Sequence, residues 1–151
     1  MNVESFDKDI ERTFEHYGPL GVDVHLLAVR DTPTPTHGDF ISVTVAVRVV
    51  APPFEYHAET WNYGGFNSHT SGPLPLGIRF IDRTRLIGAV AAAKELPPGF
   101  PLPEASGDLV WPLSPGVNEP VYFFTAGHVT IVVGAYTGTV LGGADQAAAA
   151  A

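Results

Sequence analysis

The chain of 151 residues contains no cysteine. This absence excludes disulfide bonds, thiolate nucleophiles, iron–sulfur clusters and cysteine-ligated zinc. It suits a reducing compartment, so we expect a cytoplasmic protein. The sequence also lacks any stretch of about 18 uninterrupted apolar residues, so it predicts no membrane-spanning helix. Acidic residues stand near the start, where a secretory signal needs a basic and then an apolar run, so no leader is expected.

Basic residues are scarce. Eight lysines and arginines face 16 acidic residues, which gives a formal net charge of −8 at pH 7. Nucleic-acid binding requires a clustered positive surface, so nucleic acid is not an expected partner. Acidity of this size favours solubility and suits a basic partner protein. The hydrophobic content of 45% is that of a globular protein with a core rather than of a disordered chain.

Motifs for known chemistry are also missing. The sequence contains no HExxH or EF-hand pattern, no Gly-x-Ser-x-Gly elbow and no glycine-rich phosphate loop followed by a lysine. We therefore expect no metal and no cofactor. The absence of these motifs favours a protein that is not an enzyme.

Two alternating segments predict strands, because apolar side chains at every second position line one face of a sheet. The first, at 40–50, turns one set inward: Ile41, Val43, Val45, Val47 and Val49. The second, at 128–136, does the same with Val129, Ile131, Val133 and Ala135. Further strands are expected at 22–30 (Val22, Val24, Leu26 and Ala28 on one face), 54–63, 108–113 and 121–125, and 78–82 could return to the sheet.

Helical spacing appears at the N-terminus, where Val3, Phe6, Ile10, Phe14 and Tyr17 recur between acidic residues. The pattern predicts an amphipathic helix that Gly18 and Pro19 end. An alanine-rich segment predicts a second helix at 84–96. Segments 31–39, 64–77 and 97–107 are expected to be loops because they are rich in proline and glycine.

Helices and strands do not alternate along the chain, so the sequence predicts an α+β fold with a mainly antiparallel sheet of about 5–7 strands. An N-terminal amphipathic helix and one further helix would pack on this sheet. We expect a single domain at 1–143. Residues 144–151, which are rich in alanine, would be a frayed end or an artificial extension.

An aromatic and glycine-rich stretch at 56–69 is the strongest candidate for a binding surface. Aromatic side chains offer large contact areas, and glycine lets a partner approach the backbone. The candidate partner-binding residues are Tyr56, Trp61, Tyr63, Phe66 and Asn67. The alternative is that this stretch packs over the end of the sheet.

Three other groups of residues suggest weaker sites. Arg83 and Arg85, beside the start of the second predicted helix, could hold an anion, or Asp82 could cap the helix while the arginines pair with acids. His57, Glu59 and His69 include two ligands on one strand face, but too few ligands lie near them to predict a metal site. An acid–base pair could join His25 or His128 to Asp23 or Asp108.

These features favour an acidic cytoplasmic protein-binding module, of the inhibitor, immunity or escort type, that uses its aromatic loop. The alternative is a small-molecule-binding or acid–base enzyme domain with a pocket between the sheet and the helices. The sequence leaves the partner's identity and the oligomeric state open.

Overall fold

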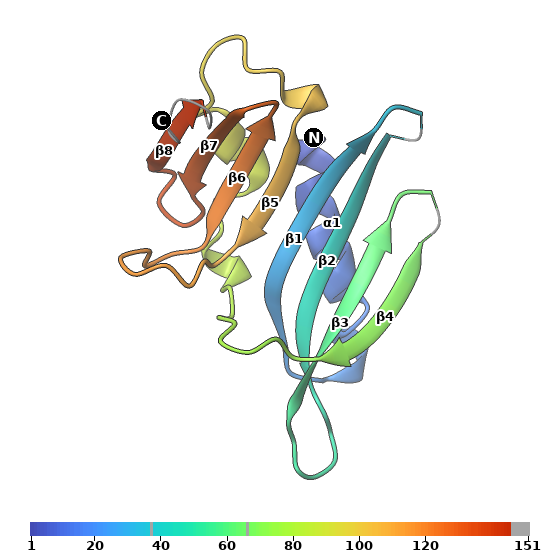
Figure 1. The fold of residues 1–151 in the computed structure, drawn as a ribbon. Helices are drawn as coiled ribbons and strands as arrows, with labels where there is room; N and C mark the ends of the chain where they lie inside the picture. Colours follow the sequence, from blue (N-terminus) through green and yellow to red (C-terminus); the bar gives the residue numbers. More distant parts are fainter. Residues whose placement is uncertain (37, 66, 146–151) are drawn as a thin grey trace.

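The computed structural model describes residues 1–36, 38–65 and 67–145, and gives only the backbone of 143–145. Within these residues the strands form one eight-stranded antiparallel sheet in the order β4-β3-β2-β1-β5-β6-β7-β8 (Figure 1). The strands are β1 (Val24–Thr34), β2 (Gly38–Arg48), β3 (Tyr56–Tyr63), β4 (Ser68–Pro73), β5 (Ser106–Val110), β6 (Val121–Ala126), β7 (Val129–Gly134) and β8 (Val140–Asp145). The helices are α1 (Val3–Glu15), α2 (Ala89–Ala93) and the short 3-10 turns η1 (Gly18–Leu20), η2 (Arg83–Arg85) and η3 (Leu102–Glu104).

The N-terminal helix forms as its sequence predicts. Asn2 caps it, since its side chain accepts a hydrogen bond from the Ser5 N–H at 3.1 Å. Phe6 and Ile10 are buried against the sheet, while the acidic residues Glu4, Glu11 and Glu15 are exposed. Both α1 and α2 lie on the same face of the sheet, behind it in Figure 1.

The main core lies between this face and the helices. It combines four inward side chains of β2 with aromatic residues of β6, and the alternating pattern predicts all four: Ile41, Val43, Val45 and Val47. The prediction that Val49 also faces inward is wrong, because Val49 lies beyond the end of β2 and is exposed. Tyr122 and Phe124 are fully buried there, and the ring of Phe6 meets that of Tyr122 at 6.1 Å. A small second cluster lies on the opposite face at one end of the sheet: Leu27, Ala46 and Ala58, packed by Tyr56, Leu74, Ile78 and Phe80.

The sheet consists of two four-stranded halves that meet at β1 and β5. Only four residue pairs join them, from Ala28 opposite Val110 to Asp31 opposite Gly107. Just before this junction a β-bulge interrupts β1 between Leu26 and Ala28. The bulge adds one residue and shifts the alternation, so Val29 instead of Ala28 continues the buried face of Leu26. The prediction that Ala28 shares the face of Leu26 is therefore wrong.

The structure confirms the predicted α+β fold and its antiparallel sheet, with more strands than expected. The two additional strands are β4 and β8, at the two edges of the sheet. All six residues of β4 are exposed, so this strand carries no alternating apolar pattern that sequence reasoning could detect. Strand β8 continues to Asp145, beyond the expected end of the domain at residue 143, and residues 146–151 of the predicted tail lie outside the described residues.

The second predicted helix is much shorter than 84–96. The chain leaves the 3-10 turn η2 in an extended conformation, and the Ile87 N–H donates to the Ala135 carbonyl at 2.9 Å. Gly88 then adopts a φ of +91°, which favours glycine and interrupts any continuous helix. The Asp7 carboxylate of α1 accepts hydrogen bonds from the Ala89 and Val90 N–H groups, at 2.7 and 3.1 Å, and so starts α2. Tertiary contacts therefore override the helical propensity of the alanine-rich segment.

In the described residues, no helix is long and apolar enough to cross a membrane.

Candidate functional site

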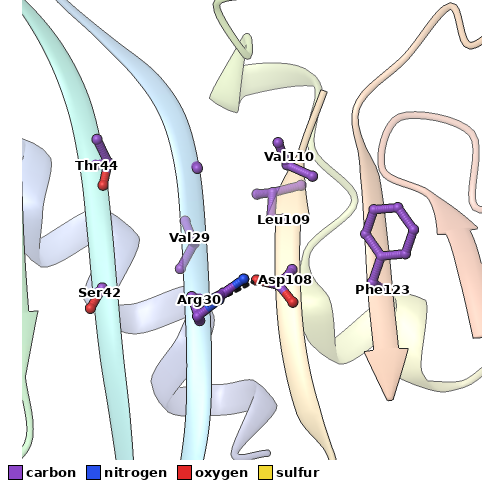
Figure 2. Close-up of a pocket in the computed structure, with 9 residues that line it drawn as sticks. Val29, Arg30, Ser42, Thr44, Asp108, Leu109, Val110 and Phe123 are labelled. Carbon is purple, nitrogen blue, oxygen red and sulfur yellow. Dashed lines mark hydrogen bonds and ion pairs between the residues drawn. The ribbon is translucent and has the colours of Figure 1, made fainter. Parts of the chain in front are cut away.

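A hollow of about 390 Å³ lies on the sheet face opposite the helices (Figure 2). It lies over the junction of β1 and β5. The side chains around it come from four neighbouring strands: Ala28, Arg30, Ser42, Thr44, Asp108, Val110 and Phe123. None of these residues is buried. Leu74, Ile78 and Phe80 cover the second cluster instead, at the other end of β1–β3.

An ion pair crosses the hollow between the two halves of the sheet. The Arg30 Nε donates to Asp108 Oδ1 at 2.8 Å, as Figure 2 shows. The Arg30 side chain is 71% exposed, so this pair adds little to stability, but it places both signs of charge at the centre of the face. The hydrogen bond to Asp108 raises the pKa of Arg30, which is charged at any relevant pH.

Hydroxyl and amide groups continue this face towards β3. The Ser42 hydroxyl donates to Asn62 Oδ1 at 2.6 Å, and the hydroxyls of Thr44 and Thr60 lie 3.0 Å apart. These cross-strand bonds hold the side chains in fixed positions. The face is therefore an ordered surface of small polar groups around a partly apolar hollow.

The structure does not gather the predicted partner-binding residues into one patch. Trp61 and Tyr63 point to the helix face of the sheet, where Tyr63 is only 4% exposed and its hydroxyl lies 2.7 Å from the Thr13 hydroxyl. Tyr56 lies on the opposite face and donates a hydrogen bond to Asp23. Asn67 is exposed just before β4, and Phe66 lies outside the described residues.

Trp61 is the centre of a packed aromatic cluster. Its ring stacks between the imidazoles of His16, at 3.9 Å, and His69, at 4.1 Å. Its indole N–H donates to the Tyr17 hydroxyl at 2.6 Å. These contacts connect α1, β3 and the edge strand β4, so Trp61 serves the packing of three elements.

Glu59 lies beside this cluster and accepts three hydrogen bonds. His57 Nε2 is 2.7 Å from Glu59 Oε2, while His69 Nε2 and the Tyr17 hydroxyl reach Oε1 at 2.6 and 2.9 Å. Burial alone would raise the pKa of Glu59, but these hydrogen bonds outweigh burial and lower it. Among the described residues, no group of three histidines or acidic residues has the geometry to hold a metal ion.

The two arginines of the predicted anion site are engaged with neighbouring residues. Arg83 Nη1 contacts both carboxylate oxygens of Glu11, at 3.0 and 2.9 Å, and its guanidinium lies over the Phe14 ring. The Arg85 guanidinium lies 4.2 Å from the centre of the Tyr136 ring. Asp82 caps η2 by accepting from the Thr84 N–H at 3.0 Å.

Of the acid–base pairs that the sequence suggests, the structure forms one. His25 Nε2 lies 2.9 Å from Asp23 Oδ1, at the exposed start of β1, and its ring stacks on Phe80. The Tyr56 hydroxyl bonds to the same Asp23 and lowers its pKa. Asp108 forms its ion pair with Arg30, and His128 is exposed in the turn between β6 and β7.

Sequence reasoning missed a group of buried acids near the N-terminal half of α1. Asp9 is 8% exposed and Asp31 is fully buried. Burial raises the pKa of Asp9, and burial together with the Asp39 carboxyl raises that of Asp31 to about 7. A signal existed for Asp9, since it lies between the buried positions Phe6 and Thr13 on the inward side of the helix.

Comparison with known proteins adds no functional information. No protein-family model matches the chain, and neither a curated protein nor a solved structure shows significant similarity to it.

Proposed function

We propose that the protein is a binding module that engages another protein through the uncovered face of its sheet, centred on the hollow between Arg30 and Phe123. The observation that carries the proposal is the unequal covering of the sheet. The helices and the main core occupy one face, while the described residues leave most of the other face open around that hollow.

The composition of this face suits transient binding of a protein partner. Transient interfaces are about as apolar as the rest of a protein surface and combine a hydrophobic centre with polar groups. Here Val110 and Phe123 supply apolar contact, Arg30 and Asp108 supply both charges, and the ordered hydroxyls surround them. Antiparallel strands also keep the surface rigid, so little conformational entropy is lost on binding.

The acidic balance of the chain agrees with a cytoplasmic inhibitor, immunity or escort protein, which we include in the proposal. The aromatic stretch at 56–69 plays a smaller part than its composition indicates. Trp61 and Tyr63 pack under α1, so they support the sheet from behind instead of meeting the partner.

The test compares capture of partners from a lysate of the source organism by three forms of the tagged protein. Thr44→Arg places a long cation in the hollow, whereas Thr139→Arg makes the same change at an exposed turn before β8. We expect one stoichiometric protein with the wild type and with Thr139→Arg, and at least about tenfold less of it with Thr44→Arg. Equal capture by both variants would show that the interface lies elsewhere on the protein. Capture of no protein by the wild type would refute the proposal.

A small-molecule site is the second candidate function. The observation that favours it is a separate hollow on the helix face of the sheet, lined by the buried Asp9, the half-buried Asp39 and two basic residues.

A further inference from the structure

A second hollow, of about 470 Å³, lies between the N-terminal half of α1 and the adjoining ends of β2 and β3. It is on the sheet face opposite the proposed interface. Its lining is mostly polar: Asn2, Ser5, Lys8, Asp9, Arg12, Asp39, Ile41, Tyr63 and Gly64.

One polar stripe of α1 forms a wall of this hollow. Ser5, Lys8, Asp9 and Arg12 are spaced so that their side chains fall on one side of a helix, three and four residues apart. The stripe runs beside the apolar face that Phe6 and Ile10 bury. A helix that only had to cover the sheet would not need a buried carboxylate at position 9.

The deeper part of the hollow carries negative charge that the protein pairs poorly. Asp9 is 8% exposed, and its nearest cation, Arg12 Nη1, is 3.6 Å away, beyond ordinary hydrogen-bond length. Asp39 Oδ2 is buried and accepts no hydrogen bond from an N–H group of the described residues; its carboxyl hydrogen-bonds to that of Asp31 when one of the two is protonated, and the Met1 ammonium lies 3.6 Å from it. A buried carboxylate without a short hydrogen bond from a cation is costly, so Asp9 would gain from a ligand that offers N–H donors, and Asp39 adds a second acidic group to the same hollow.

The rim of the same hollow carries positive charge. Lys8 is exposed there, and Arg12 holds its guanidinium 4.7 Å from the centre of the Tyr63 ring, with about half of its side chain exposed. Ile41 and the ring of Tyr63 add apolar surface to the lining. The hollow thus presents acids that are mostly buried, bases that are exposed, and some apolar surface.

We infer that this hollow binds a small zwitterion of the α-amino acid class, with its ammonium towards Asp9 and Asp39 and its carboxylate towards Lys8 and Arg12. The two charges of such a ligand match the acidic and the basic residues of the lining, and a volume of about 470 Å³ is within the range of small-molecule sites. The inference is independent of the proposed interface on the other face.

The first experiment titrates the purified, isotope-labelled protein with each of the 20 common L-amino acids, followed by amide resonances in NMR spectra. For any amino acid that binds, the titration is repeated with its carboxamide, which lacks the negative charge, and with its deaminated acid, which lacks the positive charge. We expect at least one amino acid to bind with shifts around α1 and Tyr63, and each analogue to bind at least about tenfold more weakly.

Matched variants then assign the binding to this hollow. The chain has two lysines, so Lys8→Gln removes the cation at the rim, while Lys94→Gln makes the same change at the exposed end of α2. We expect Lys8→Gln to raise the Kd about tenfold and Lys94→Gln to leave it unchanged. Asp9→Asn should also weaken binding at least about tenfold, and its fold, checked by circular dichroism, should be intact because burial disfavours charge at this position.

Several results would overturn the inference. They are no shift with any amino acid at about 10 mM, equal binding of both analogues, or equal effects of the two lysine variants. The assay contains no partner protein, and Thr44→Arg should bind the amino acid like the wild type. A failure here is therefore distinguishable from a failure of the proposed interface.

Discussion

Replacing Asp31 by asparagine should stabilise the protein at neutral and alkaline pH, although it removes a charge. Asp31 is fully buried in β1, and its Oδ2 accepts a hydrogen bond from the Asn2 N–H at 3.1 Å. Its Oδ1 and the Oδ2 of Asp39 are buried and accept no hydrogen bond from an N–H group of the described residues, so the hydrogen bond between the two carboxyls needs a proton on one of them. The two carboxyls therefore interact through a shared proton, and in the Asp31→Asn variant an amide N–H would take the place of that proton.

The magnitude follows from the pKa. Burial first, and then the Asp39 carboxyl, raise the pKa of Asp31 from 3.8 to about 7, while the Asn2 N–H and the Met1 ammonium act in the opposite direction. Between these two values the folded protein binds a proton that the unfolded chain has released, so stability falls as the pH rises. Three pKa units correspond to a ceiling of about 4 kcal/mol, nearly all of it present above about pH 7.

The assay is urea denaturation, followed by tryptophan fluorescence, of the wild type and of Asp31→Asn at pH values from about 4 to 8. The two proteins should differ by less than about 1 kcal/mol at pH 4, and the variant should gain up to about 4 kcal/mol by pH 8. Asp108→Asn, in the neighbouring strand, removes a partly exposed acid as a control and should show no such gain. If Asp31→Asn is less stable by the same amount at every pH, Asp31 is ionised in the folded state and the reasoning is refuted.

Three further substitutions test the packing. Trp61→Ala should lower the free energy of unfolding by about 2–4 kcal/mol, because it removes the stack between His16 and His69; an unchanged denaturation midpoint would show that Trp61 is free for a partner. Asp7→Ala should cost about 1–2 kcal/mol by uncapping α2, and a thermal melt equal to the wild type would contradict that role. Val45→Asp should prevent folding, as circular dichroism would show, because it buries an unpaired charge; a soluble, folded variant would mean that the register of β2 is wrong.

The strands that the sequence predicts well are those with one buried face. The alternation in β2 and β7 follows from burial of every second side chain, so it is visible without the structure. Strand β4 has no buried residue, and its place at the edge depends on pairing with β3 and on the contacts of His69 with Trp61 and Glu59. Such a strand is specified by its neighbours and leaves no periodic signal in its own sequence.

The sequence did not predict the positions of the candidate sites, for a different physical reason. Composition drew attention to the aromatic residues at 56–63, but alternation along β3 sends Tyr56 to one face and Trp61 and Tyr63 to the other, where α1 covers them. The hollow on the open face is lined by side chains from four strands. It depends on the pairing of β1 with β5, which joins residues nearly 80 positions apart in the sequence. Local patterns carry no information on such a pairing.

Strand β2 carries both proposed sites and also separates them. Asp39 and Ile41 face the hollow under α1, while the next residues on the opposite face, Ser42 and Thr44, face the open hollow. Because successive side chains of a strand point to opposite faces, a change at Thr44 alters one site and leaves the groups of the other in place. Val43, between Ser42 and Thr44, is an uncharged residue buried in the core. Loss of amino acid binding in Thr44→Arg would therefore indicate that the two faces are coupled through movement of β2 itself.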